Sequence, residues 1–170
     1  PDQSSAASDV YKRQLISLSM IFAGSSVFAE TTFEKIKRTG KVTVGTEAAF
    51  PPFEFVEDGK IVGYGKDILD YIVADMKVEL NQLDLPWQGI LPGVLAGKFD
   101  FVATSVSIRA ERAKKYAFTV PIAEGTNWVM KRSGDASIDS PDDLSGKVVC
   151  TQLASGSEKA TKEWEEDMKS

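Results

Sequence analysis

The segment 103–112, ATSVSIRAER, carries residue types that bind an anion. A predicted strand delivers Thr104 to a loop, and a predicted short helix begins at Ala110, so hydroxyls and backbone N–H groups lie between two elements, where anions commonly bind. Arg112 has the planar, two-pronged guanidinium that grips a carboxylate through two parallel hydrogen bonds. The spacing alone equally allows Arg112 to be a surface arginine that pairs with Glu111 or with solvent.

The segment 47–55, EAAFPPFEF, directly follows a predicted strand. Loops at the carboxyl ends of parallel strands line ligand crevices, and a proline-rich loop holds an aromatic side chain rigidly at low entropic cost. We expect Phe53 and Phe55 to be core residues. Phe50 fits either the core or a ligand contact.

A third segment, 154–157 (ASGS), falls at a predicted turn from strand to helix. Small residues at such a turn let backbone amides approach a ligand. The signal is weak when taken alone, because most turns of this kind bind nothing.

Composition excludes several kinds of chemistry. The chain has no histidine, which removes Ser-His-Asp and Cys-His catalysis and histidine-based zinc sites. The one cysteine, Cys150, allows no disulfide within the chain. The net charge of -5 argues against a nucleic-acid partner, which needs a basic face. We expect no cofactor and no metal.

The elements that must position these segments alternate between strand and helix. A loop is predicted over 46–59, Gly40 is a predicted helix C-cap, Pro92 is placed in the first turn of its helix, and Ser140 is a predicted N-cap. Strands are predicted at 41–45, 61–63, 78–83, 99–104, 127–131 and 147–151, and helices at 31–38, 68–76, 87–96, 110–115 and 158–169.

This alternation predicts an α/β layered architecture with a largely parallel sheet. We assign residues 30–126 to a first lobe and residues 127–170 to the start of a second. The polar stretch 133–140 breaks the pattern and is the best candidate for the boundary between the lobes.

Both ends of the chain have unusual features. Residues 15–29, LISLSMIFAGSSVFA, resemble the apolar core and cleavage site of a secretory signal peptide, with cleavage expected after Ala29. Residues 1–14 resemble translated adaptor sequence from DNA library preparation and are interpreted as a non-native artefact. The chain stops at Ser170 inside a predicted helix, so we expect a fragment truncated at both ends. No cysteine follows the cleavage site, which predicts a soluble periplasmic protein without a lipid anchor.

Four motifs together resemble one family. The segments 47–67, 87–92, 99–112 and 142–158 occur in the order and spacing of the polar amino-acid-binding proteins of ABC importers, the extracellular solute-binding proteins of family 3. The resemblance covers residues 41–159. It implies a two-lobe α/β fold of the type II periplasmic-binding-protein kind, with the first lobe nearly complete and the second cut off.

The resemblance also implies roles for individual residues. Phe50 matches the aromatic position that stacks on the ligand side chain, Glu47 an often acidic position facing the pocket, and Trp87 the apolar position that floors it. The remaining positions bind the amino-acid backbone of the ligand, with Arg112 pairing with its α-carboxylate. They are Ser105, Ser107, Arg112, Ser155, Gly156 and Ser157.

Two positions depart from the family pattern. Arg109 stands where the family often has threonine, so a hydroxyl N-cap is lost. Gly65 stands where the family usually has aspartate. The acidic residue that binds the ligand ammonium in the family falls in a region that this chain does not include.

The predicted function is therefore capture of a free amino acid, with a lean towards a basic or polar one, and delivery to the transmembrane subunits of an ABC permease. We expect a monomer and no enzymatic activity. Two alternatives stay open on this fold. One is the ligand-binding domain of a membrane sensor or receptor. The other is an enzyme similar to cyclohexadienyl dehydratase, which needs a carboxylate as general acid, and Glu47 is the only candidate for it in this sequence.

Overall fold

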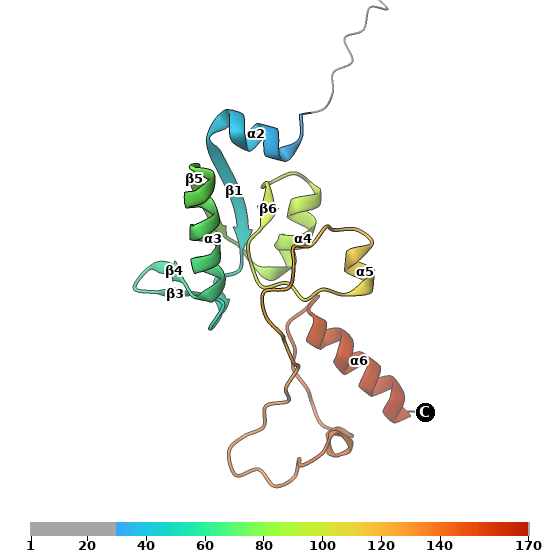
Figure 1. Ribbon diagram of the computed structural model, residues 1–170. Helices are drawn as coiled ribbons and strands as arrows, with labels where there is room; N and C mark the ends of the chain where they lie inside the picture. Colours follow the sequence, from blue (N-terminus) through green and yellow to red (C-terminus); the bar gives the residue numbers. More distant parts are fainter. Residues whose placement is uncertain (1–29, 170) are drawn as a thin grey trace, which may run out of the picture. The chain divides into compact units, whose positions relative to one another are not determined.

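The computed structural model describes residues 30–169 (Figure 1). The predictions for residues 1–14 and 15–29 lie outside this range. The chain divides into two compact units, residues 1–38 and 39–170, and each is described by itself.

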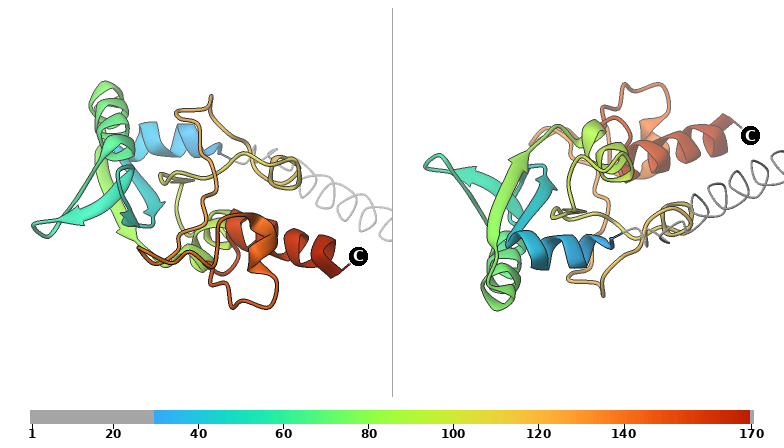
Figure 2. Two further views of the ribbon diagram at one scale, coloured as in Figure 1. Left: turned by 90° about the horizontal axis from the view of Figure 1, so that it is seen from below. Right: turned by 90° about the horizontal axis from the view of Figure 1, so that it is seen from above.

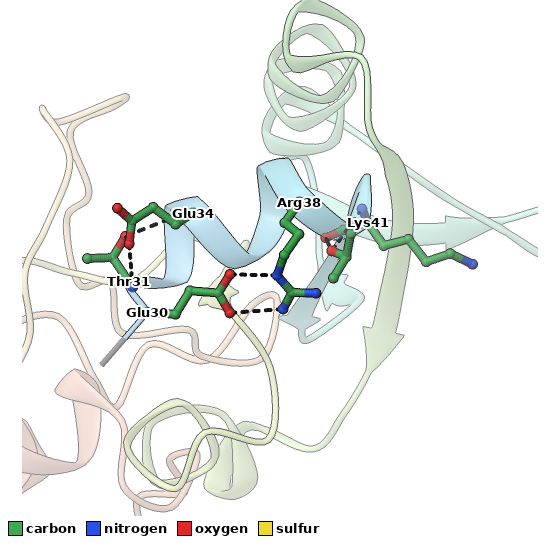
Figure 3. A network of polar contacts seen from close by, with 6 residues as sticks. Glu30, Thr31, Glu34, Arg38 and Lys41 are labelled. Carbon is green, nitrogen blue, oxygen red and sulfur yellow. Dashed lines mark hydrogen bonds and ion pairs between the residues drawn. The ribbon is translucent and has the colours of Figure 1, made fainter. Parts of the chain in front are cut away.

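The described part of the first unit is residues 30–38, which hold helix α2 (Thr32–Thr39) apart from its last residue. The Thr31 hydroxyl accepts a hydrogen bond from the Glu34 N–H at 3.2 Å, and the Glu34 carboxylate accepts one from the Thr31 N–H at 2.9 Å. This reciprocal pair is a capping box, which satisfies backbone donors at a helix start. Arg38 donates from Nε and from its terminal nitrogen to the two oxygens of Glu30, at 2.7 and 2.9 Å (Figure 3). Gly40, at φ 65°, follows the helix end as predicted.

A parallel three-stranded sheet forms the centre of the second unit. Strand β1 (Lys41–Thr46) lies between β5 (Glu79–Asp84) and β6 (Phe101–Val102). All of its pairings are parallel. Val42, Val44 and Thr46 are buried and, as alternate residues of the central strand, lie on one face of the sheet. The predicted parallel sheet is confirmed, although β6 is shorter than the predicted strand over 99–104.

A second sheet corrects the predicted loop over 46–59. Strands β2 (Ala49–Phe50), β3 (Glu54–Glu57) and β4 (Lys60–Val62) are antiparallel neighbours in that order. Asp58 and Gly59 join β3 to β4 with positive φ values of 50° and 74°. An Asp-Gly pair in this conformation is the turn that closes a two-residue hairpin, so the sequence did contain the signal for it.

Helix α4 (Trp87–Leu95) packs on the parallel sheet through the ring of Phe99. A Cβ atom added to Gly45 in β1 would lie 2.7 Å from this ring, and one added to Gly93 in α4 would lie 2.6 Å from it. Both glycines therefore make room for Phe99 in a closely packed core. Pro92 lies inside α4 and not in its first turn as predicted. Because proline has no N–H, the carbonyl of Gln88 loses its hydrogen-bond partner within the helix. Gln88 is an exposed residue.

The remaining helices are α3 (Tyr64–Met76), α5 (Ala110–Ala113), the short 3₁₀ helix η1 (Pro141–Leu144) and α6 (Gly156–Lys169). They confirm the predicted helices, including η1 directly after Ser140. Across residues 30–169, no helix has the length and apolar character needed to span a membrane.

The strands predicted at 127–131 and 147–151 do not form. Between α5 and α6 the described chain contains η1 and no strand (Figure 2). Trp128 is 84% exposed and Val148 is 94% exposed. Within residues 30–169 neither segment has a neighbouring strand to pair with, and an extended apolar segment needs such a partner to become a strand.

Candidate functional site

Three segments with predicted site residues leave the parallel sheet at one edge. Glu47 follows the end of β1, Trp87 comes shortly after the end of β5, and the 103–107 loop follows β6. Thr46 links these ends, because its hydroxyl donates to the Ala103 carbonyl at 2.8 Å and accepts from the Gln82 side chain at 2.9 Å. The carboxyl edge of a parallel sheet is where ligands bind in α/β proteins.

Arg112 of α5 is held by backbone carbonyls and an aromatic ring. Its guanidinium donates to the Ser107 carbonyl at 3.2 Å and to the Ala154 carbonyl at 3.5 Å. The guanidinium carbon lies 5.3 Å from the centroid of the Trp87 ring, a cation–π distance. Arg112 therefore joins two predicted site residues, Trp87 and Ser107.

Arg112 takes part in none of the ion pairs among residues 30–169, although the carboxylate of the neighbouring Glu111 favours its charged form. The pKa of Arg112 is lowered, first by burial and then by the positive charge of Arg109. A partly buried cation beside a second cation is stabilised by an anion that pairs with it. The arrangement can accept a carboxylate.

Ala154 connects Arg112 to a residue from another element. Its carbonyl also accepts the indole N–H of Trp87, at 3.0 Å. Trp87 is buried, and Ala154 adopts a left-handed φ of 60°. Two donors from α4 and α5 thus meet at one backbone oxygen just before α6.

The predicted turn 155–157 starts α6. The Ser155 hydroxyl accepts the Glu158 N–H at 3.1 Å, as an N-cap does, and the Ser157 hydroxyl donates to Asn127 at 3.1 Å. A Cβ atom on Gly156 would lie 2.0 Å from a terminal nitrogen of Arg109, so the absent side chain gives Arg109 its place. Arg109 gives α5 no side-chain cap, in agreement with the prediction.

Glu47 and Phe50 contact different residues, and neither contacts Arg112 through a hydrogen bond or ring contact among the described residues. Glu47 accepts a hydrogen bond from the Gln152 side chain at 2.6 Å. Phe50 is 48% exposed and stacks on Phe53, with ring centroids 5.4 Å apart. Among the described residues the ring contacts of Phe50 do not include Trp87, so the structure does not bring these two predicted ligand contacts together.

Ser105 uses both of its donors on an acidic residue that the sequence did not single out. Its N–H and its hydroxyl donate to the two carboxylate oxygens of Glu54, at 3.1 and 3.0 Å. The Thr104 hydroxyl donates to the same carboxylate at 3.2 Å. Glu54 is only 2% exposed, and burial raises its pKa, against the opposing effect of these hydrogen bonds.

Gly65 gives the Glu54 carboxylate its space. A Cβ atom at this position in the first turn of α3 would lie 1.9 Å from the Glu54 Oε1 atom. This close approach accounts for glycine where the family usually has aspartate. The Thr104-Ser105 pair after a strand and the missing side chain at position 65 are the sequence features that could have indicated Glu54, but the prediction of a loop over 46–59 left residue 54 without a role.

Comparison with known proteins identifies the family of this chain. Residues 42–169 match the family model of the bacterial extracellular solute-binding proteins, family 3. The L-cystine-binding protein TcyJ of Escherichia coli (strain K12) is 34% identical over 143 residues, which make up 81% of this chain and 54% of that protein. The chain thus spans about half the length of this curated relative.

Two solved structures share the fold. An ancestral amino acid-binding protein, AncCDT-1, described as a precursor of cyclohexadienyl dehydratase, has a TM-score of 0.72 and 33% identity, covering 79% of this chain and 61% of its own. The arginine-bound form of truncated ArgBP from T. maritima has a TM-score of 0.67 and 30% identity, covering 76% of this chain and 62% of its own. Both structures are of amino-acid-binding proteins, and they confirm the α/β fold that the family resemblance predicted.

Proposed function

Because the chain belongs to family 3 of the bacterial extracellular solute-binding proteins, we propose that the full-length protein captures a free amino acid outside the cytoplasmic membrane and delivers it to the permease of an ABC importer. In this proposal residues 30–126 belong to one lobe and residues 127–170 begin the other. The ligand is trapped where the two meet, and closure over it signals the importer.

The observation that carries the proposal is the setting of Arg112. A partly buried guanidinium is held by two carbonyls against an indole ring and takes part in none of the ion pairs among residues 30–169. The carboxylate of an amino acid supplies the missing negative charge through two parallel hydrogen bonds. We assign supporting roles to the other predicted positions. They are Glu47, Phe50, Trp87, Ser105, Ser107, Ser155, Gly156 and Ser157.

The identity of the amino acid is a finer part of the proposal. The exposed ring of Phe50 is suited to stacking on a flat or long side chain, and the carboxylate of Glu47 attracts a basic one. One structural neighbour is described as arginine-bound, and one relative is a cystine-binding protein. We therefore favour a basic or polar amino acid, bound by a monomeric periplasmic protein that catalyses no reaction.

A thermal-shift panel of the standard amino acids and cystine tests this proposal on the full-length protein without its leader. A ligand at about 100 times its dissociation constant adds about 2.7 kcal/mol of stability, which raises Tm by several degrees. A shift with one or two amino acids, lost in the Arg112→Ala variant, is the expected result.

The opposite outcome is as clear. No shift with any amino acid would overturn the proposal, whereas a shift of full size in Arg112→Ala would overturn the role assigned to Arg112. Loss of prephenate on incubation with the protein would favour the dehydratase alternative, which is worth including because one neighbour is described as a precursor of cyclohexadienyl dehydratase.

A further inference from the structure

We propose that Glu54 is a positioning residue, a buried anchor that holds the 103–109 loop in the shape that presents Arg112 to the ligand. The proposal rests on the proposed function, because it concerns the same site. Glu54 itself does not touch the ligand in this proposal and acts through Ser105 and Thr104.

The first argument is the way in which Glu54 is bound. Its carboxylate accepts three hydrogen bonds, two from Ser105 and one from Thr104. All three donors belong to Thr104 and Ser105, the second and third residues after the end of β6, so one side chain from β3 fixes the first part of the loop. Ser105 donates with its backbone N–H as well as its hydroxyl, which restrains the main chain directly.

The second argument is the cost of this arrangement. A carboxylate that is 2% exposed loses most of its hydration, and none of the ion pairs within residues 30–169 gives Glu54 a cation in return. A leucine or glutamine at the start of β3 would avoid this cost. Gly65 adds to it, since glycine in a helix is less stable than alanine and is needed here to leave room for the carboxylate.

The third argument connects the anchor to the ligand. The loop held by Glu54 continues to Ser107, whose carbonyl accepts from Arg112 at 3.2 Å. Movement of Ser105 therefore moves the carbonyl that orients the guanidinium. Binding geometry is sensitive to such displacements, and a misplacement of about 1 Å can cost a large factor in a site built on alignment.

Hydrogen exchange and calorimetry on the full-length protein test the proposal. The variants are Glu54→Ala and Glu54→Gln, with Glu57→Ala as the matched control, because Glu57 is an exposed glutamate on the same strand. Hydrogen exchange followed by mass spectrometry reports on peptides that cover the 103–109 loop. Titration calorimetry uses four probes, L-arginine, L-cystine, L-glutamate and L-histidine.

In Glu54→Ala we expect exchange of the 103–109 loop to be faster by roughly tenfold or more, while peptides of β1 and β5 exchange at the wild-type rate. We expect affinity for the probe that binds wild type to weaken by a similar factor. Glu54→Gln keeps an acceptor and the volume, so it should recover part of both losses. Glu57→Ala should match wild type in both measurements.

Unchanged exchange of the 103–109 loop in Glu54→Ala would overturn the proposal that Glu54 anchors this loop. Faster exchange with unchanged affinity would overturn its role in positioning Arg112. If wild type binds none of the four probes, the proposed amino-acid binding fails for these ligands, and the exchange data still decide whether Glu54 holds the loop. If Glu54→Ala unfolds as a whole, exchange in β1 and β5 also becomes faster. Loop exchange and affinity of Glu54→Gln are then compared with those of Glu57→Ala, and equal values in the two variants would overturn the proposal.

Discussion

A Gly65→Ala substitution should destabilise the protein when Glu54 is present and stabilise it when Glu54 is replaced by alanine. Alanine is the better helix former, by up to about 1 kcal/mol, so propensity alone predicts a gain at this position in the first turn of α3. The structure predicts the opposite sign, because the added Cβ would lie 1.9 Å from the carboxylate of Glu54.

The magnitude follows from the geometry. Ordinary contact of a Cβ atom begins near 3.4 Å, so the carboxylate must retreat by about 1.5 Å from its present 1.9 Å. Its hydrogen bonds to Ser105 and Thr104, now 3.0 to 3.2 Å long, do not survive a shift of that size. Overpacking of a well-packed site costs about 1–3 kcal/mol. We expect Gly65→Ala to lower the free energy of unfolding by about that amount.

The double variant isolates the contact. In the Glu54→Ala background the Cβ meets no carboxylate, so Gly65→Ala should be neutral or stabilising by up to about 1 kcal/mol. The two effects of one substitution then differ by about 1–4 kcal/mol, a span that overlaps the roughly 0.5–3 kcal/mol typical of residues in direct contact. Gly89→Ala in α4 is the matched control, because its Cβ would meet nothing within 4 Å.

Urea denaturation of the four proteins, followed by circular dichroism and tryptophan fluorescence, measures the cycle. Coincident transitions and equal m-values are needed for the comparison. If Gly65→Ala changes stability by the same amount and sign in both backgrounds, the reasoning is refuted. A loss of stability in Gly89→Ala equal to that in Gly65→Ala would also count against it, since the cost would then come from the helix and not from Glu54.

Three further predictions use other contacts. Arg112→Lys should weaken binding of the amino acid roughly tenfold or more by calorimetry, with little change in the Tm of the unliganded protein, because lysine keeps the charge and loses the two-pronged grip. Gly93→Ala should lower the free energy of unfolding by about 1–3 kcal/mol in urea, although alanine favours helix, because its Cβ would lie 2.6 Å from the Phe99 ring; a smaller loss in a Phe99→Leu background would identify the ring as the cause. Burial raises the pKa of Glu54, so the folded protein keeps this proton to higher pH than the unfolded chain. The stability of wild type relative to Glu54→Gln should therefore fall as pH rises above the ordinary glutamate pKa, and a difference that grows with pH would contradict it.

The parallel sheet and its helices could be predicted from local pattern. The alternation at 41–45 and the helical spacing of Leu69 with its apolar neighbours carry the information within a few residues, and β1 and α3 form where it indicates. Gly40 and Ser140 mark a helix end and a helix start as their residue types predict. Each of these signals depends on one short stretch of chain, so it can be interpreted without knowing the rest of the fold.

The wrong predictions for the two strands and for residue 54 concern contacts between distant residues. The strands predicted at 127–131 and 147–151 need a neighbouring strand, which no local pattern guarantees. Glu54 was placed in a loop, where an acid faces solvent, and its burial is decided by Ser105 and Gly65 from other parts of the chain. Pro92 sits within α4 because only the exposed Gln88 carbonyl is affected. For the two strands and for Glu54 the deciding energy comes from a distant partner that local propensity does not include, whereas the place of Pro92 depends on a carbonyl four residues before it in the same helix.

The Ala154 carbonyl has a consequence for how this protein can diverge. It belongs to the main chain, so no substitution at position 154 can delete it, whereas the donors Trp87 and Arg112 can each be lost by a single mutation. Ser155 and Ser157 can therefore vary to suit a new ligand while the acceptor beside them persists, whereas a side chain at Gly156 would meet Arg109. Selection can therefore act on this contact only through its donors, and we expect positions 87 and 112 to be the ones at which related proteins gain or lose it.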